Sequence, residues 1–260
     1  MPKADTLAAL RQSLASCELD CGSPRTVPLG HAGADAILSG GLRLGALHEV
    51  YASDVSYSAS ACGFTAALAL RLGGERYLFW VVTDFALMEF GAPNANGLLD
   101  VGVDPERLIL LRMSNGEDAL RAASDILSCN GVGAVVIEIS GALKALDLTA
   151  SRRLSLAAAQ KSVSPILLRV GAQPETSAAE TRWLIHSAMP PPDDWGPPRF
   201  NVRLLRNRHG ELGHWEMEWD CDNGLFRQPD NHHITPDYGD LVAATADRPL
   251  AAQKRIHQAV

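Results

Sequence analysis

The tripeptide Gly63-Phe64-Thr65 stands where a nucleotide site would bind phosphate, between a strand-like run at residues 47–51 and a helix-like run. In a phosphate-binding loop this turn reads Gly-Lys-Ser or Gly-Lys-Thr. Backbone N–H groups surround the phosphates, the lysine reaches the terminal phosphates, and the hydroxyl binds Mg²⁺. Here Phe64 replaces the lysine, and Ser58 replaces the first glycine of the loop. The sequence predicts the frame of a nucleotide site without its central positive charge.

Two interpretations of this segment follow. The loop could still bind a nucleotide through backbone N–H groups, or it could be a relic, a helix N-terminus with Phe64 packed in the core. We favour the relic, because without the lysine several phosphate charges stay uncompensated. We therefore expect no catalysis and no cofactor. Residues 53–63 are small and polar, so we expect them to form a loop before a helix at residues 64–72.

Composition bounds the class of protein. The chain has 260 residues, 47% of them hydrophobic and 20% charged, as in a globular protein with a full core. It has no apolar run of the roughly 20 residues that a membrane span needs, and its first residues lack the apolar stretch of a signal peptide. The five cysteines contain no C-x-x-C pair, so we expect neither a metal nor disulfides, and a cytoplasmic location. With a net charge of −7, we expect any DNA contact to be local or made through a partner.

Strand-like runs alternate with helical segments in the middle of the chain. The strands are expected at residues 46–52, 77–82, 107–112, 134–139 and 165–170, and further helices at 117–129 and 148–161. Asn115 is the expected N-cap of the first of these two helices, and Asp147 or Thr149 that of the second. The alternation predicts an α/β fold with a mostly parallel sheet covered by helices on both faces.

The pattern changes after residue 171. Segments 181–186, 200–205 and 214–219 alternate apolar and polar residues, which predicts antiparallel strands at the edge of the sheet. Trp215, Met217 and Trp219 share one face, and we expect that face to pack in the core rather than dock a partner. The expected organisation is an N-terminal helix and linker at 1–28, a domain at 29–224, and a flexible tail at 225–260.

Several segments resemble the RecA family in order: 29–45, 47–51, 81–87, 101–104, 115–120 and 135–138. The resemblance implies a RecA-like α/β core with a degenerate phosphate loop. It places Asp84 at the position of the catalytic glutamate and Glu138 at that of the magnesium-side acid. Because the lysine is missing, we expect these two residues to be polar strand-end residues rather than a general base and a magnesium ligand.

A closer resemblance is to the ImuA family of bacterial proteins, also described as RecA-like or SulA-like. It is carried by segments 45–49, 97–108, 148–154, 181–183, 204–210 and 215–220, and by the strand that contains Trp80. The resemblance implies a non-catalytic accessory protein of the SOS response to DNA damage, acting in a translesion synthesis complex. The implied partners are an ImuB-type Y-family polymerase-like protein, RecA as a second candidate, and an error-prone polymerase indirectly.

Two groups of residues are candidates for partner binding. Leu7, Leu10 and Leu14 form a narrow apolar stripe on the expected N-terminal helix, which suits a groove on another protein. The second group is basic. Arg152 and Arg153, near the start of a helix, could contact a partner or DNA phosphate or could lie on a solvated helix face. Arg203, Arg206 and Arg208 form a cluster near the end of a strand. A basic cluster in an acidic protein favours an interface with an acidic surface.

Two other functions remain open at this point. The chain could be a divergent RecA-like ATPase in DNA repair that recruits a lysine or arginine from elsewhere or from a neighbouring subunit. It could also be a binding protein that inhibits cell division, as the SulA-like description implies.

Overall fold

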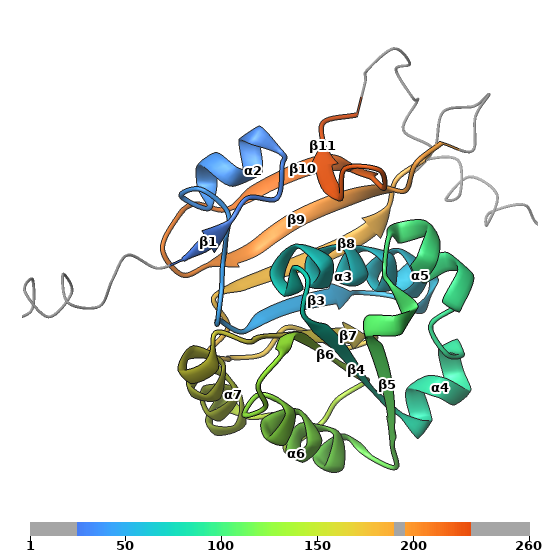
Figure 1. The fold of residues 1–260 in the computed structure, drawn as a ribbon, viewed down its shortest axis with the longest axis vertical. Coiled ribbons are helices and arrows are strands. Elements are labelled where there is room, and N and C mark those ends of the chain that lie inside the picture. The colour runs from blue at the N-terminus through green and yellow to red at the C-terminus, as the bar shows by residue number, and fades with distance from the viewer. Residues whose placement is uncertain (1–24, 190–195, 230–260) are drawn as a thin grey trace, which may run out of the picture.

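In a computed structural model, which describes residues 25–189 and 196–229, the chain forms an α/β fold around one large sheet (Figure 1). The sheet has nine strands in the order β11-β10-β9-β8-β3-β7-β6-β4-β5. The strands from β8 to β5 are parallel, and β9 to β11 continue the sheet in antiparallel pairing. The strands are β3 (His48–Ala52), β4 (Tyr77–Thr83), β5 (Leu108–Met113), β6 (Val132–Ser140), β7 (Ser164–Val170), β8 (Thr181–Ser187), β9 (Arg199–Asn207), β10 (Gly213–Asp220) and β11 (Leu225–Arg227).

Helices cover both faces of the parallel part, which confirms the predicted fold class (Figure 1). The helices are α2 (Ala32–Ile37), α3 (Ser58–Gly73), α4 (Asp84–Phe90), α5 (Ala95–Val101), α6 (Gly116–Ile126) and α7 (Leu148–Lys161), with short 3-10 turns η1 (Val55–Tyr57) and η2 (Pro105–Arg107). Alternate residues of one strand enter separate cores: Trp80 belongs to the α3 side, and Val81 to the α6 and α7 side. This alternation explains why the parallel strands read as continuous apolar runs.

Local capping signals predicted two helices well. Asn115 caps α6, because its side chain accepts a hydrogen bond from the backbone N–H of Asp118. Asp147 caps α7 through the N–H of Ala150, so of the two expected caps it is Asp147. The bounds of α7 are those predicted, whereas α6 ends three residues before the predicted Cys129, at Ile126.

The expectation of a loop at 53–63 is wrong. After β3 the chain makes the short turn η1 and then enters α3, which begins at Ser58 and not at Phe64. The side chain of Asp54 caps η1 by accepting from the N–H of Ser56. The segment that follows, Ser58-Ala59-Ser60-Ala61-Cys62, contains neither proline nor glycine, and alanine is the strongest helix former. The small residues that suggested a loop therefore extend the helix.

Three short helices, α2, α4 and α5, have no counterpart among the predicted elements. They have six or seven residues each, fewer than two turns of apolar periodicity. Each begins at a side-chain cap: His31, Thr83 and Asn94. Two further short strands, β1 (Thr26–Val27) and β2 (Leu42–Arg43), pair antiparallel, and β1 lies in the expected linker.

The C-terminal strands follow the prediction with two differences. β8 pairs parallel with β3 on one side and antiparallel with β9 on the other, so it is the strand at which the direction changes. β11 lies inside the expected tail, and its Phe226 is fully buried. The sheet therefore includes three residues that we expected in the tail. Met217 and Trp219 are fully buried, as expected for core packing, and Trp215 is half-buried.

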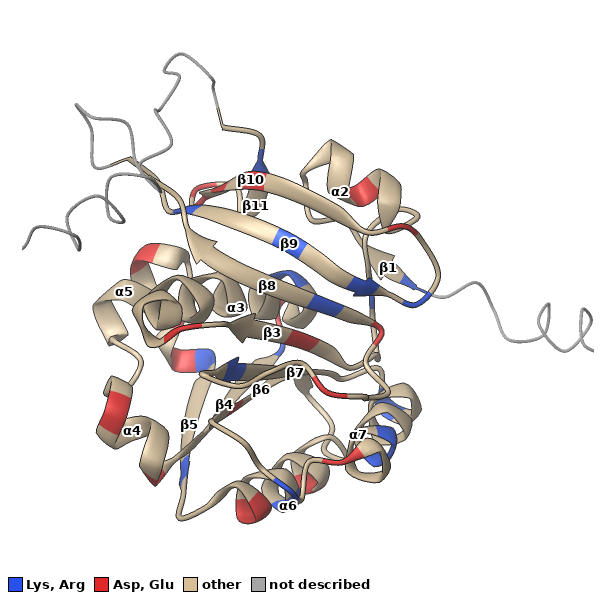
Figure 2. Cartoon of the chain, turned by 180° about the vertical axis from the view of Figure 1, so that it is seen from behind, with Lys and Arg blue, Asp and Glu red and all other residues tan. Residues whose placement is uncertain are grey.

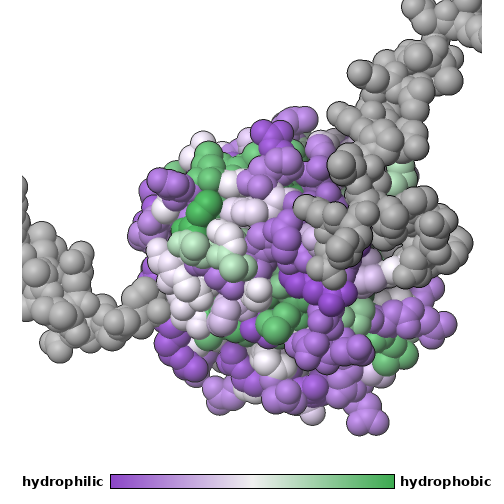
Figure 3. All heavy atoms as spheres, turned by 90° about the horizontal axis from the view of Figure 1, so that it is seen from above, coloured by the Kyte–Doolittle hydropathy of each residue, from purple (hydrophilic) through white to green (hydrophobic). Residues whose placement is uncertain are grey.

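The expected N-terminal helix with Leu7, Leu10 and Leu14, and the remainder of the expected tail after residue 229, lie outside the described residues. On the face seen in Figure 3, hydrophilic residues surround smaller hydrophobic areas. Single exposed apolar residues of this kind are normal on a protein surface and indicate no site by themselves.

Candidate functional site

The position of the missing phosphate loop is occupied by helix. Gly63, Phe64 and Thr65 lie in the second turn of α3, where each backbone N–H bonds to the carbonyl four residues earlier. The N–H of Ser58, the first residue of α3, bonds to the carbonyl of Val55. The N–H groups that the alternative interpretation would use for phosphate at residues 63–65 are thus bonded within the helix.

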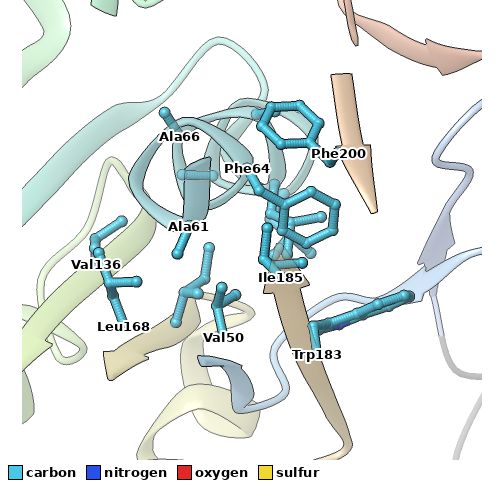
Figure 4. Close-up of a cluster of buried hydrophobic side chains, with 14 of the residues drawn as sticks. Val50, Ala61, Phe64, Ala66, Val136, Leu168, Trp183, Ile185 and Phe200 are labelled. Carbon is cyan, nitrogen blue, oxygen red and sulfur yellow. The ribbon is translucent and has the colours of Figure 1, made fainter. Parts of the chain in front are cut away.

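Phe64 packs in the core, as the relic interpretation expects, and none of its surface is exposed. Its ring centroid lies 5.9 Å from that of Trp183 and 5.6 Å from that of Phe200, and Figure 4 shows Phe64 among these residues. Thr65 is also fully buried, and its hydroxyl has no hydrogen-bond partner among the described residues. The positions that would reach phosphate and Mg²⁺ therefore point into the protein interior.

Three of the predicted site residues nevertheless meet at one pocket. Ser58, Gly63 and Glu138 line a cavity of about 350 Å³ between the start of α3 and the segment that joins α4 to α5. We call it the Glu138 pocket. Its complete lining is Ser58, Ala59, Cys62, Gly63, Phe90, Gly91, Ala92, Pro93, Asn94, Gly97, Leu98, Val101 and Glu138.

Glu138 gives the pocket its one ionisable carboxyl group. The side chain projects from β6 on the α3 side, and the residue is 5% exposed. Its Oε2 accepts a hydrogen bond of 2.8 Å from Nε1 of Trp80 on the neighbouring strand. Burial raises the pKa of Glu138 above its usual value, and the bond from Trp80 opposes that shift. Burial also raises the pKa of the nearby Cys62 thiol to about 12, with a smaller contribution from Glu138.

Asp84 does not join this group. It is the first residue of α4, directly after β4 and after the cap Thr83. Its carboxylate pairs with Arg112 at the end of β5 and does not line the Glu138 pocket. The RecA resemblance assigns Asp84 and Glu138 to one nucleotide site. In the structure they make separate interactions: Asp84 forms an exposed ion pair, and Glu138 accepts a buried hydrogen bond.

The structure brings together three of the five predicted arginines. Arg152 of α7 and Arg206 and Arg208 at the end of β9 line one hollow of about 370 Å³. Figure 2 shows basic positions on α7 and along β9. We call this site the basic hollow; its lining is Leu148, Arg152, Ser155, Leu156, Ser177, Ala178, Arg206 and Arg208.

The positive charges of the arginines in the basic hollow are not neutralised by acidic side chains of the described residues. Their guanidinium groups make no ion pair or hydrogen bond among residues 25–189 and 196–229, whereas nearby Arg182 pairs with Glu49. Leu156, on the same hollow, is 67% exposed. The hollow therefore offers cationic donors beside an apolar side chain, which fits an acidic segment with an apolar residue.

The other two predicted arginines lie elsewhere. Arg153 points to a separate hollow between α7 and α6, lined also by Glu117 and Arg121. Arg203 is exposed in the middle of β9, opposite His214 of β10. The sequence analysis did not name Leu156 as a candidate residue, although the helical spacing identifies it. Leu154 and Ala158 lie four residues apart on the buried face of α7, and Leu156, between them, lies on another face.

Among the described residues, no three His, Cys, Asp or Glu side chains gather in a way that could hold a metal ion. Over the same residues, none of the helices has the length and apolar character needed to cross a membrane.

Comparison with known proteins gives the family. No family model matches the chain. The protein ImuA of two strains of Caulobacter vibrioides, NA1000/CB15N and ATCC 19089/CB 15, is 37% identical to it over 199 residues. In both cases the match covers 69% of this chain and 77% of the relative. This chain belongs to the ImuA family.

Proposed function

We propose that the protein is a non-catalytic accessory subunit in damage-induced mutagenesis, and that it acts through protein contacts in a translesion DNA synthesis complex. Membership of the ImuA family supports the process. The proposed direct partner is an ImuB-type Y-family polymerase-like protein, with RecA as a second candidate. An error-prone polymerase and DNA would be reached through that partner.

The buried position of Phe64 is the observation that carries the non-catalytic part. A side chain at that place in α3 points between β8 and β9, toward Trp183 and Phe200, and away from solvent. No lysine there could reach a nucleotide without leaving the core. The helix also uses the N–H groups that would otherwise bind phosphate. A buried side chain at position 64 and helix-bonded N–H groups at residues 63–65 both argue against phosphate binding at this tripeptide.

The basic hollow supports the contact part of the proposal. Three arginines that have no acid partner within residues 25–189 and 196–229 raise the local positive potential on a chain whose net charge is −7. Such a patch favours approach of an acidic partner surface and fixes its orientation. Exposed Leu156 adds apolar area that a partner could bury. We therefore place the partner contact at the basic hollow.

The proposal is tested by association with the ImuB-type protein of the same organism. Reversing Arg206 and Arg208 together (R206E and R208E) should slow association about 10-fold at low salt and reduce its salt dependence. The matched control reverses Arg153 and Arg203, which carry the same charges outside the hollow, and should associate as wild type does.

Two outcomes contradict the proposal. If the hollow variant associates as fast as wild type, or if the control variant loses as much as the hollow variant, the contact does not lie at the basic hollow. If the folded wild-type chain binds neither the ImuB-type protein nor RecA, the accessory function itself is wrong.

A further inference from the structure

The Glu138 pocket is a built cavity that the proposed partner contact does not use. One wall is the first two turns of α3, and the other is the segment from Phe90 to Val101. Alanine and glycine form much of both walls, so the space of about 350 Å³ is not filled by side chains. Phe90 and Leu98 provide apolar surface. This volume lies at the lower end of the range for small-molecule sites, about 300–1,000 Å³.

One acceptor in this pocket has no partner among the residues that the structure describes. Oε2 of Glu138 is bonded to Trp80, whereas no described residue donates to Oε1 of the same carboxyl group. The residue is only 5% exposed, so bulk water compensates little of its charge. No arginine, lysine or histidine is among the residues that line the pocket. A buried carboxylate in this position is stabilised best by a cationic N–H donor, which here would have to belong to a ligand.

Phosphate does not fit these features. The carboxyl of Glu138 repels an anion, and the N–H groups at Gly63 are used inside α3. An apolar ring, in contrast, suits the apolar surface of Phe90 and Leu98, and a cationic donor group on that ring suits Glu138. We propose that the Glu138 pocket binds a small molecule with a flat apolar body and a cationic amidine-like donor group, which contacts Oε1 of Glu138. This inference does not depend on the partner contact at the basic hollow.

The test uses benzamidine as the probe and benzoate, which has the same shape and the opposite charge, as its comparison. Ligand-observed NMR titration of the full-length protein should show benzamidine binding at least 10-fold tighter than benzoate, with no competition from ATP. Glu138→Gln should weaken benzamidine binding at least 10-fold, because the amide keeps an acceptor for Trp80 but loses the charge. Ala59→Trp, at an exposed position of the pocket wall, should block binding.

The matched control is Glu75→Gln, which removes the same charge from a side chain that is 96% exposed and does not line the pocket. It should bind benzamidine as wild type does. The inference is overturned if benzamidine binds no tighter than benzoate, if the Ala59→Trp protein still binds it, or if ATP displaces it. If the Glu138→Gln protein fails to fold, the comparison with benzoate and the Ala59→Trp variant still test whether the Glu138 pocket binds benzamidine.

Discussion

The rings of Phe64 and Phe226 pack with their centroids 5.1 Å apart and their planes tilted by 43°. Phe64 belongs to α3, at the position that a phosphate-binding lysine would take, and Phe226 belongs to β11, the last described strand. Trp219 and Phe200 complete the cluster around Phe226. The residue at the expected lysine position is thus part of the packing that attaches the final strand to the core.

We expect Phe226→Ala to lower the free energy of unfolding by about 3–5 kcal/mol, since it removes a fully buried aromatic side chain and leaves a cavity. Urea denaturation followed by tryptophan fluorescence measures the change. Leu212→Ala is the control, because Leu212 is 59% exposed and should cost less than about 0.5 kcal/mol. Equal effects of the two substitutions would show that β11 does not pack as described.

We expect Thr65→Val to raise the free energy of unfolding by about 1 kcal/mol. The Thr65 hydroxyl is buried without a hydrogen-bond partner, and valine replaces it with a methyl group of similar shape. Thr65→Ser, which keeps the hydroxyl and loses the methyl group, should instead destabilise the protein. Thermal and urea unfolding of the three proteins distinguish these effects. A destabilised valine variant would mean that the hydroxyl has a partner in solution.

We expect no ATP hydrolysis by the purified protein, with or without single-stranded DNA. Restoring the motif with Phe64→Lys should not create activity, because the new ammonium group would lie in the core rather than beside a nucleotide. The same substitution should cost several kcal/mol of stability, since it buries an unpaired charge. Steady-state phosphate release with RecA as positive control is the measurement. Turnover near that of RecA in either protein would favour the divergent ATPase.

We expect stability to fall as the pH is lowered from about 6.5 toward 4, because of His48. Burial lowers the pKa of His48 from 6.5 to about 4, opposed by its hydrogen bond to the carbonyl of Arg43. Below pH 6.5 the unfolded chain therefore binds a proton at His48 that the folded chain does not. The resulting loss in the free energy of unfolding reaches about 3 kcal/mol at a pH where His48 is protonated in both states.

The control for this pH dependence is His48→Gln, which should unfold with a flatter slope between pH 4 and 6.5. Glu138 acts in the opposite direction, because its raised pKa stabilises the folded state at low pH. The difference between wild type and His48→Gln isolates the histidine. If the free energy of unfolding of the two proteins depends on pH in the same way, the pKa of His48 is not lowered by folding and this prediction is wrong.

The sequence by itself determined the features that depend on neighbouring residues. Strand-like runs predicted β3 to β7, and the candidate caps, Asn115 for α6 and Asp147 or Thr149 for α7, predicted where these helices start. These signals are local, because the residue pattern of a strand and the cap residue of a helix are each contained in a few neighbouring positions. The sequence alone likewise showed phenylalanine at the position where a phosphate loop would carry a lysine.

Only the tertiary structure decided which of the candidate residues meet. Arg152 shares a hollow with Arg206, 54 positions later in the chain, because the fold brings one side of α7 and the end of β9 to the same hollow, whereas neighbouring Arg153 faces α6. Glu138 meets the start of α3 because β6 lies under that helix, and Asp84 is turned away to Arg112. The early start of α3 also has no strong local signal, since small residues suit both a loop and a tightly packed helix. Long-range packing chooses between such alternatives, and a single sequence does not encode those contacts in its local pattern.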